Sequence, residues 1–272
     1  MDFLKSYGVS LNELLLAPIV FRETWPPLRD LPHVTADAMR ELAAFGGHSA
    51  GAIRTAMSRL RSGGTIEQLP EAGEARYRMG RFGRSVSLAV RGRFERPEGF
   101  VLAVFSFAAD DVRERQLVRE TLKSHGFQKL AQNVYINGQI DTSELERVIG
   151  ENGLSEHLFL FRCNDDAESS RDERLVRLFN VKQRAQQLVR FEADLHAFLN
   201  ERGVDDDEFA RRYFAAGPAH HRITFMEEPP LPARCLPPDY PLERLLSYPE
   251  PSPKRLRAVV DYFRRINQEP RS

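Results

Sequence analysis

GHSAGAIRTAMSRLRSGG, residues Gly47–Gly64, predicts one short helix between two glycine stops. Ser49 is a favourable N-cap, and the closing glycine pair can take the left-handed conformation that commonly ends a helix. Successive residues of an α-helix lie 100° apart around its axis, so Ile53, Met57 and Leu60 share one face. We expect this face to be buried against the rest of the fold.

The opposite face of the same helix is small, polar and basic. A helix that enters the major groove of DNA needs small residues for close approach, hydroxyl groups for phosphates or base edges, and guanidinium groups that can bind guanine O6 and N7. An ordinary amphipathic helix with a solvated basic face remains the alternative. The residues on this face are Gly51, Arg54, Thr55, Ser58, Arg61 and Ser62.

The flanking sequence favours DNA binding over the alternative. Thr35 is an N-cap for a preceding helix, ADAMRELAAF, and the glycine turn after it makes the pair a helix-turn-helix. TIEQL and ARYRM flank the turn-rich PEAGE and predict a two-stranded hairpin, the wing of a winged helix. By the period-2 rule, Arg76 and Arg78 share one face of its second strand.

Eight residues are therefore the candidates for DNA binding. We expect Arg54, Thr55, Ser58 and Arg61 to enter the major groove. The remaining arginines would hold phosphates or probe the minor groove. The full set is Ser49, Arg54, Thr55, Ser58, Arg59, Arg61, Arg76 and Arg78.

Charge is distributed unevenly along a chain whose formal net charge is zero. Residues 48–96 contain ten arginines and four glutamates, whereas residues 97–167 contain twelve acidic and seven basic residues. Phosphate contacts dominate the affinity of proteins for DNA. A locally basic segment therefore favours DNA binding although the total is neutral.

The rest of the chain predicts an α+β multidomain protein. Residues 3–22 read as a helix that Pro18 kinks or ends, and another short helix is expected around Phe82–Phe94. From Phe100 to Cys163 the order is β-α-β-β-α-β, the split unit of ferredoxin-like folds. Further helices are expected over 171–179, 181–202, 205–216, 220–226 and 253–267, with a break at Gly217-Pro218.

The predicted domains follow from this order. Residues 1–96 form a winged helix-turn-helix DNA-binding domain, and residues 97–167 form a ferredoxin-like domain. Residues 168–272 form a helical C-terminal domain with an ordered proline-rich strap, EPPLPARCLPPDYP.

Composition narrows the class of protein. The chain is 42% hydrophobic and 29% charged, which is typical of a globular protein. No apolar run is long enough to cross a bilayer, and no export signal is visible, so we expect a cytoplasmic protein without membrane contact. Cys163 and Cys235 have neither a disulfide framework nor a metal-ligand spacing. No phosphate-binding glycine motif or nucleophile elbow is present.

Three segments resemble the PaaX family, repressors of phenylacetic acid degradation operons. AIRTAMSRLRSGG resembles the recognition helix of the family, LKSHGFQKLAQNVYIN its central segment, and EEPPLPARCLPPDYP its C-terminal strap. HHR, His220–Arg222, stands where a His-x-Tyr-Arg stretch is common. Thr65-Ile66, Phe100 and Tyr240 occupy places where the family usually has tryptophan.

The resemblance implies a transcriptional regulator, a repressor of an aromatic-acid catabolic operon, that an acyl-CoA effector such as phenylacetyl-CoA releases from DNA. The replaced tryptophans leave another aromatic acyl-CoA, or a different molecule, open as the effector. We expect a homodimer, since paired half-sites supply the affinity that one small module lacks. No catalytic residue, resident cofactor or metal is expected.

Other residues allow two further hypotheses. Asp110–Asp111 follow the first ferredoxin-like strand, where a metal-dependent nuclease of similar fold holds an aspartate, but capping of the next helix is the simpler interpretation. A winged helix that docks a protein partner is the other hypothesis. Adjacent histidines on a helix point about 100° apart, so His220-His221 and Cys235 are interpreted as packing or surface residues. Three aromatic residues could line an effector pocket, although core packing is the simpler interpretation of each: Tyr213, Phe214 and Phe225.

Overall fold

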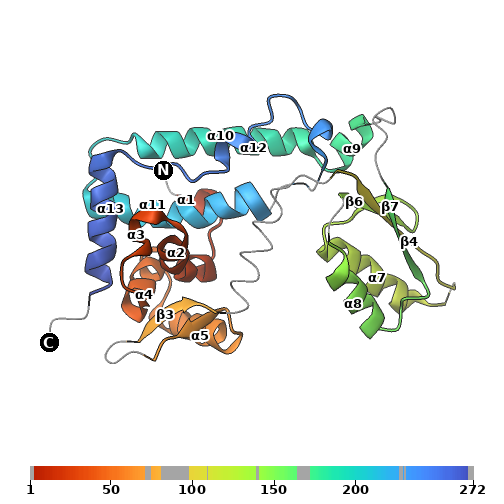
Figure 1. Cartoon of the computed structure of the whole chain (residues 1–272), viewed down its shortest axis with the longest axis horizontal. Helices are drawn as coiled ribbons and strands as arrows, with labels where there is room; N and C mark the ends of the chain where they lie inside the picture. Colours follow the sequence, from red (N-terminus) through yellow and green to blue (C-terminus); the bar gives the residue numbers. More distant parts are fainter. Residues whose placement is uncertain are drawn as a thin grey trace. The chain divides into compact units, whose positions relative to one another are not determined.

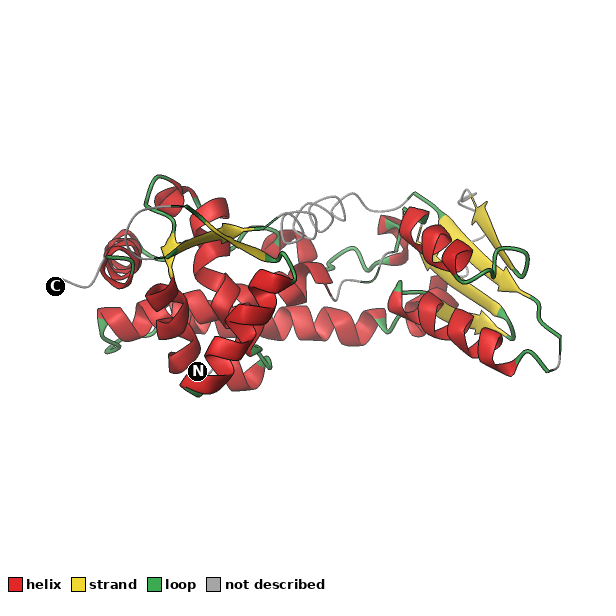
Figure 2. Cartoon of the chain, turned by 90° about the horizontal axis from the view of Figure 1, so that it is seen from below, coloured by secondary structure: helices red, strands yellow, loops and turns green. Residues whose placement is uncertain are grey.

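The computed structural model describes residues 3–70, 75–80, 98–108, 110–138, 141–163, 172–226, 229 and 231–268. The chain forms two compact units, coloured by sequence in Figure 1. Unit 1 comprises Met1–Gly92, Leu188–Glu227 and Leu242–Ser272, and unit 2 comprises Arg93–Gln187 and Glu228–Pro241. Each unit has its own antiparallel sheet (Figure 2).

The first half of unit 1 contains α1 (Phe3–Ser6), α2 (Leu11–Thr24), α3 (Pro26–Arg29), α4 (Ala36–Phe45) and α5 (Ala50–Ser62). The three strands β1 (Val34–Thr35), β2 (Ile66–Gln68) and β3 (Arg76–Met79) pair in the order β1-β3-β2. The predicted pair of helices and the predicted hairpin are confirmed. The two-residue strand β1, which pairs with β3, was not predicted from the sequence.

Local capping explains where α4 and α5 begin. The hydroxyl oxygen of Thr35 accepts a hydrogen bond from the backbone N–H of Ala38, and that of Ser49 accepts one from Ala52. Gly47 between the two helices has a φ of 79°, which a residue with a Cβ rarely adopts. The sequence therefore determines this turn locally.

The prediction of one continuous helix over residues 3–22 is wrong. The chain breaks between α1 and α2, where Ser10 and Glu13 form a capping box that starts a new helix. Pro18 lies inside α2 and does not end it.

The second half of unit 1 contains α11 (Asp206–His221), the π-helical turn η2 (Arg222–Met226), α12 (Leu242–Leu245) and α13 (Pro253–Ile266). The predicted break at Gly217-Pro218 is absent, because α11 continues to His221. A Cβ on Gly217 would lie 2.3 Å from the Phe21 ring, so this glycine allows α11 to approach α2 closely. The helix α10 (Val181–Leu199) contributes residues to both units.

Unit 2 contains the predicted β-α-β-β-α-β order, which is confirmed. The elements are β4 (Phe100–Phe105), α7 (Val112–Ser124), β5 (Gln128–Ala131), β6 (Val134–Gly138), α8 (Ser143–Glu151) and β7 (Leu158–Cys163). All strand pairs are antiparallel, in the order β5-β6-β4-β7. One core joins the sheet to α7 and α8 through residues such as Val101, Phe105, Leu122 and Leu145.

A second apolar cluster joins the sheet of unit 2 to the proline-rich strap. Phe100 and Ile136 of the sheet cluster with Leu231 and Cys235 of the strap, which contains the 3₁₀ turn η3 (Ala233–Cys235). Leu175 of α9 (Asp172–Leu178) packs against the same cluster.

The two units group the chain differently from the three consecutive domains predicted at 1–96, 97–167 and 168–272. The physical reason is packing between segments distant in sequence: α11 and α13 lie against α2 and α4, whereas the strap lies against β4 and β6. The helix predicted around Phe82–Phe94 falls outside the described residues. Within the described ranges, no helix has the length and apolar character needed to span a bilayer.

Candidate nucleic-acid interface

The buried face of α5 attaches the helix to unit 1. Ile53, Ala56 and Leu60 are buried, and Met57 is half-buried. Ile53 and Leu60 are buried as predicted, whereas Ala56 is more deeply buried than the longer Met57. A helix anchored along this stripe presents its other side to solvent.

The outer face of α5 is exposed and basic. Arg54, Thr55, Ser58, Arg59 and Arg61 are all exposed. Over the described part of the chain, neither Arg54 nor Arg59 has an ion pair or a side-chain hydrogen bond. Their guanidinium groups are therefore available to an external anion.

Two further side chains on this face make weak or local contacts. Nη1 of Arg61 lies 3.4 Å from Oε1 of Gln68, a long hydrogen bond to an uncharged partner. The Thr55 hydroxyl donates to the carbonyl oxygen of Gly51, one turn earlier, at 3.1 Å. Neither contact neutralises the positive charge.

The N-terminus of α5 adds to the positive field. Its first turn contains no acidic residue, and Ser49 caps it with a neutral hydroxyl. By contrast, Asp206, Asp207 and Glu208 occupy the first turn of α11. Because the N-terminal end of a helix carries a partial positive charge, the α5 terminus attracts anions whereas the α11 terminus is already compensated.

Arg78 on β3 is placed differently from the arginines of α5. Glu67 lies directly opposite on β2, and its carboxylate accepts two hydrogen bonds from Arg78, at 3.2 Å from Nε and 3.1 Å from Nη2. These hydrogen bonds raise the pKa of Arg78 above its usual value. The hairpin pairing thus places a carboxylate beside this candidate and offsets its charge.

Arg76 on the same strand is half-buried and reaches the other edge of the sheet. Its Nη1 donates to the carbonyl oxygen of His33 at 2.8 Å. The structure therefore brings Ser49 and the five α5 residues together on one surface and holds Arg76 and Arg78 in contacts within the fold.

Sequence reasoning missed the role of Glu67. The register places Glu67 directly opposite Arg78, so cross-strand pairing of opposite charges was the available indication.

The carboxylates considered for a nuclease lie at the start of α7. Asp111 occupies the N-cap position, but its Oδ2 accepts a hydrogen bond from the preceding Ala108 N–H at 3.1 Å instead of capping the first turn. Among the described residues, no group of three or more His, Cys, Asp or Glu side chains could hold a metal ion.

The histidine and aromatic candidates lie in packed surroundings. His220 is 3% exposed, with Nε2 2.7 Å from the carbonyl oxygen of Leu245, and its ring lies near Phe191 and Tyr248. Tyr213 and Phe214 are fully buried, and both contact Phe21. The Phe225 side chain falls outside the described residues.

Comparison with known proteins identifies the central segment. Residues 98–176 match the family model of the PaaX protein central Cas2-like domain. This match confirms the resemblance to the PaaX family that the sequence predicted. No protein of the curated collection matches the chain.

A solved structure, "Uncharacterized protein Rv0674 from Mycobacterium tuberculosis", is similar in fold. Its TM-score is 0.54 at 16% sequence identity, over 95% of this chain and 97% of that chain. At this identity the likeness concerns the fold alone.

Proposed function

We propose that the protein is a PaaX-like transcriptional regulator that binds double-stranded DNA through α5. In this proposal α4 and α5 form the helix-turn-helix, and β2 and β3 form the wing. The observation that carries it is the exposed α5 face, on which Arg54 and Arg59 have no acidic partner among the described residues. The match of residues 98–176 to a PaaX domain agrees with this assignment.

The side chains on α5 suit different parts of the duplex. Arg54, Thr55, Ser58 and Arg61 are proposed to approach base edges in the major groove, because an arginine can bind guanine O6 and N7 with two hydrogen bonds. Ser49 and the backbone N–H groups beside it suit a phosphate at the helix N-terminus. Arg59 suits a neighbouring phosphate.

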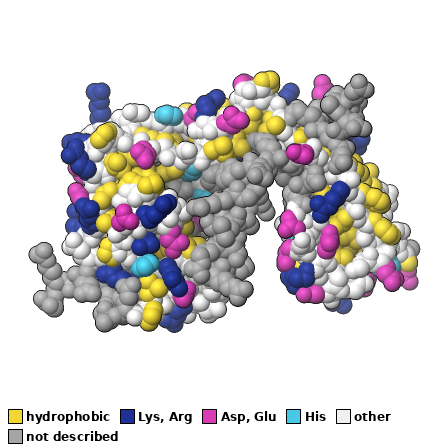
Figure 3. Space-filling model, viewed as in Figure 1, with side chains coloured by type: hydrophobic (Ala, Val, Ile, Leu, Met, Phe, Trp, Pro, Cys, Tyr) yellow, Lys and Arg dark blue, Asp and Glu magenta, His cyan; other side chains and the backbone are white. Residues whose placement is uncertain are grey.

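A homodimer would place two such helices on paired half-sites about one helical turn of DNA apart. Support comes from β7, an edge strand of the unit 2 sheet that carries Phe159 and Phe161, each 52% exposed. Figure 3 shows hydrophobic side chains gathered over this part of the unit. Exposed aromatic residues on an edge strand favour association with another chain.

The finer regulatory role rests on the family resemblance. We propose a repressor of an aromatic-acid catabolic operon, with an acyl-CoA such as phenylacetyl-CoA as the effector that releases DNA. An effector can shift this equilibrium only by binding the DNA-free state more tightly than the DNA-bound state.

In the decisive experiment, the full chain is titrated into the DNA that lies upstream of the operon encoding it. The double variant Arg54→Ala with Arg61→Ala should lose on the order of 100-fold in affinity, because each base or phosphate contact contributes about 1–3 kcal/mol. Arg190→Ala, which removes an exposed guanidinium from α10, is the matched control and should bind like the wild type.

Unchanged binding by the double variant would refute the assigned surface. Mg²⁺-dependent cleavage of the DNA that Asp110→Ala abolishes would instead establish the nuclease alternative. Absence of any affinity for DNA at low salt would favour a module that docks a protein partner.

A further inference from the structure

Asn267, the residue that ends α13, reaches the edge of the three-stranded sheet. It is 4% exposed, and all polar atoms of its side chain bind the backbone of one short segment. Its Oδ1 accepts from the N–H of Thr35 at 2.6 Å, and its Nδ2 donates to the carbonyl oxygens of His33 at 2.9 Å and Pro32 at 3.2 Å. More than 230 residues of sequence separate the partners.

This arrangement reproduces the hydrogen bonding of a neighbouring strand. On one side, β1 pairs with β3. Because backbone groups two residues apart point to the same side of a strand, the His33 carbonyl and the Thr35 N–H both face the side of β1 that points away from β3. The side-chain amide of Asn267 supplies one acceptor and one donor there, as a peptide group of a fourth strand would.

Thr35 links this edge to the helix pair. Its hydroxyl caps α4 by accepting from the Ala38 N–H at 3.2 Å, while its own N–H binds Asn267. The helix α4 in turn packs against α5. Thr35 therefore connects Asn267 to the start of α4, and α4 packs against the helix that carries Arg54.

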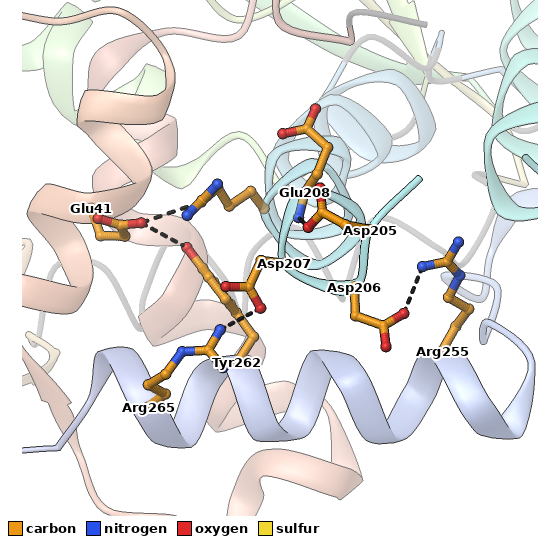
Figure 4. Close-up of polar contacts among 9 residues, drawn as sticks. Glu41, Asp205, Asp206, Asp207, Glu208, Arg255, Tyr262 and Arg265 are labelled. Carbon is orange, nitrogen blue, oxygen red and sulfur yellow. Dashed lines mark hydrogen bonds and ion pairs between the residues drawn. The ribbon is translucent and has the colours of Figure 1, made fainter. Parts of the chain in front are cut away.

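A second contact joins α13 to the middle of α4. Oε1 of Glu41 accepts from the Tyr262 hydroxyl of α13 at 3.4 Å and from Nε of Arg211 of α11 at 3.2 Å (Figure 4). Two ion pairs, Asp206–Arg255 and Asp207–Arg265, tie α13 to the start of α11. The ion pairs thus hold both ends of α13 against α11, and Tyr262, between them, binds α4.

We infer that Asn267 is a positioning residue for the DNA-binding surface: its hydrogen bonds to the β1 edge set the placement of α4 and α5. The inference rests on the proposed function. It makes the C-terminal helix a working part of the DNA-binding unit, so that affinity for DNA depends on a residue that does not touch DNA.

The test compares Asn267→Ala with Val259→Ala. Val259 is fully buried in the same helix, so its truncation weakens the packing of α13 without removing the bonds to β1. Unfolding of unit 1 is followed through the fluorescence of Trp25, the sole tryptophan, which is 7% exposed. Affinity for the upstream DNA is then measured at a temperature at which both variants are fully folded.

We expect Asn267→Ala to bind DNA about 10-fold more weakly than the wild type and Val259→Ala to bind like it. Hydrogen exchange at the Thr35 and Ala38 amides should accelerate in Asn267→Ala alone. Gln268→Ala, a change at the exposed next residue, should alter neither measurement.

The outcomes separate the two proposals. If the wild type binds DNA and the two folded variants bind it equally well or equally poorly, Asn267 has only a structural role and the inference is overturned. Unchanged amide exchange in Asn267→Ala overturns it as well. A wild type that does not bind DNA defeats the proposed function, and with it any positioning role toward DNA.

Discussion

The arginines of α5 and those of β3 lie in the same unit but are in different electrostatic states. Arg54 and Arg59 project from a helix whose first turn has no acid. Arg78 faces the Glu67 carboxylate across the hairpin, and Arg76 donates to the His33 carbonyl. The count of positive residues in the sequence treats these groups alike, whereas the structure leaves the guanidinium groups on the helix to solvent.

The contrast teaches that local pairing, more than charge content, decides where an anion can bind. A guanidinium already hydrogen-bonded to a carboxylate has its charge offset and two of its five N–H donors occupied, so it attracts a phosphate less strongly. Changes on α5, on the scaffold that carries both elements and on the β2–β3 hairpin can each test this contrast.

The largest effect is expected from Ser58→Glu on α5. A carboxylate in the centre of the exposed face would oppose phosphates directly, so affinity for the upstream DNA should fall by more than about 100-fold. Fluorescence anisotropy at two salt concentrations measures this loss. Gln186→Glu adds the same charge to an exposed position of α10, and a comparable loss there would mean that net charge, not the α5 face, controls binding.

Acidification should lower the stability of unit 1, which carries both α5 and β3. Burial lowers the pKa of His220 to about 4, from its ordinary value of 6.5. Below pH 6.5 the unfolded chain binds a proton at this ring that the folded chain does not bind until about pH 4. The free energy of unfolding should therefore fall as the pH decreases through this window, by about 3 kcal/mol in total.

Urea unfolding followed by Trp25 fluorescence at pH 7 and pH 4.5 checks this prediction. His220→Gln should show a weaker pH dependence than the wild type. His196→Gln, at an exposed histidine of α10, should keep the dependence of the wild type. If the free energy of unfolding fell with pH as much in His220→Gln as in the wild type, other groups would be responsible for the pH dependence.

The smallest effect is expected at the Glu67–Arg78 pair. Arg78→Ala removes the guanidinium that offsets the Glu67 carboxylate beside the proposed DNA surface and should lower affinity for DNA about 3-fold, whereas Glu67→Gln removes that anion and should raise affinity by a similar factor. The double variant should resemble the wild type. A 10-fold loss from Arg78→Ala in the Glu67→Gln background would show that Arg78 contacts DNA directly, and the contrast between α5 and β3 would no longer hold.

Sequence reasoning succeeded where the determinants are local. Thr35 and Ser49 cap α4 and α5 because each hydroxyl binds an N–H three residues later. The β-α-β-β-α-β order of unit 2 follows from the change in hydrophobic period after Phe100. The capping box at Ser10 was also a local indication, but the prediction of one continuous helix passed over it.

Sequence reasoning failed where contacts between distant segments decide the local structure. Gly217-Pro218 is typical of a helix end, yet α11 continues because Gly217 lets it pack against Phe21. The short β1 strand has no periodic pattern of its own, and it is held by β3 on one side and by Asn267 on the other.

The sequence by itself determined the α4–turn–α5 unit, its basic outer face and the order of elements in unit 2, because caps, glycine turns and hydrophobic periodicity act over a few residues. Only the tertiary structure decided which arginines keep an unpaired charge and which helix completes the edge of the β1-β3-β2 sheet. Those outcomes depend on contacts such as Asn267 with Thr35, whose partners are far apart in sequence and meet only when buried surfaces pack together.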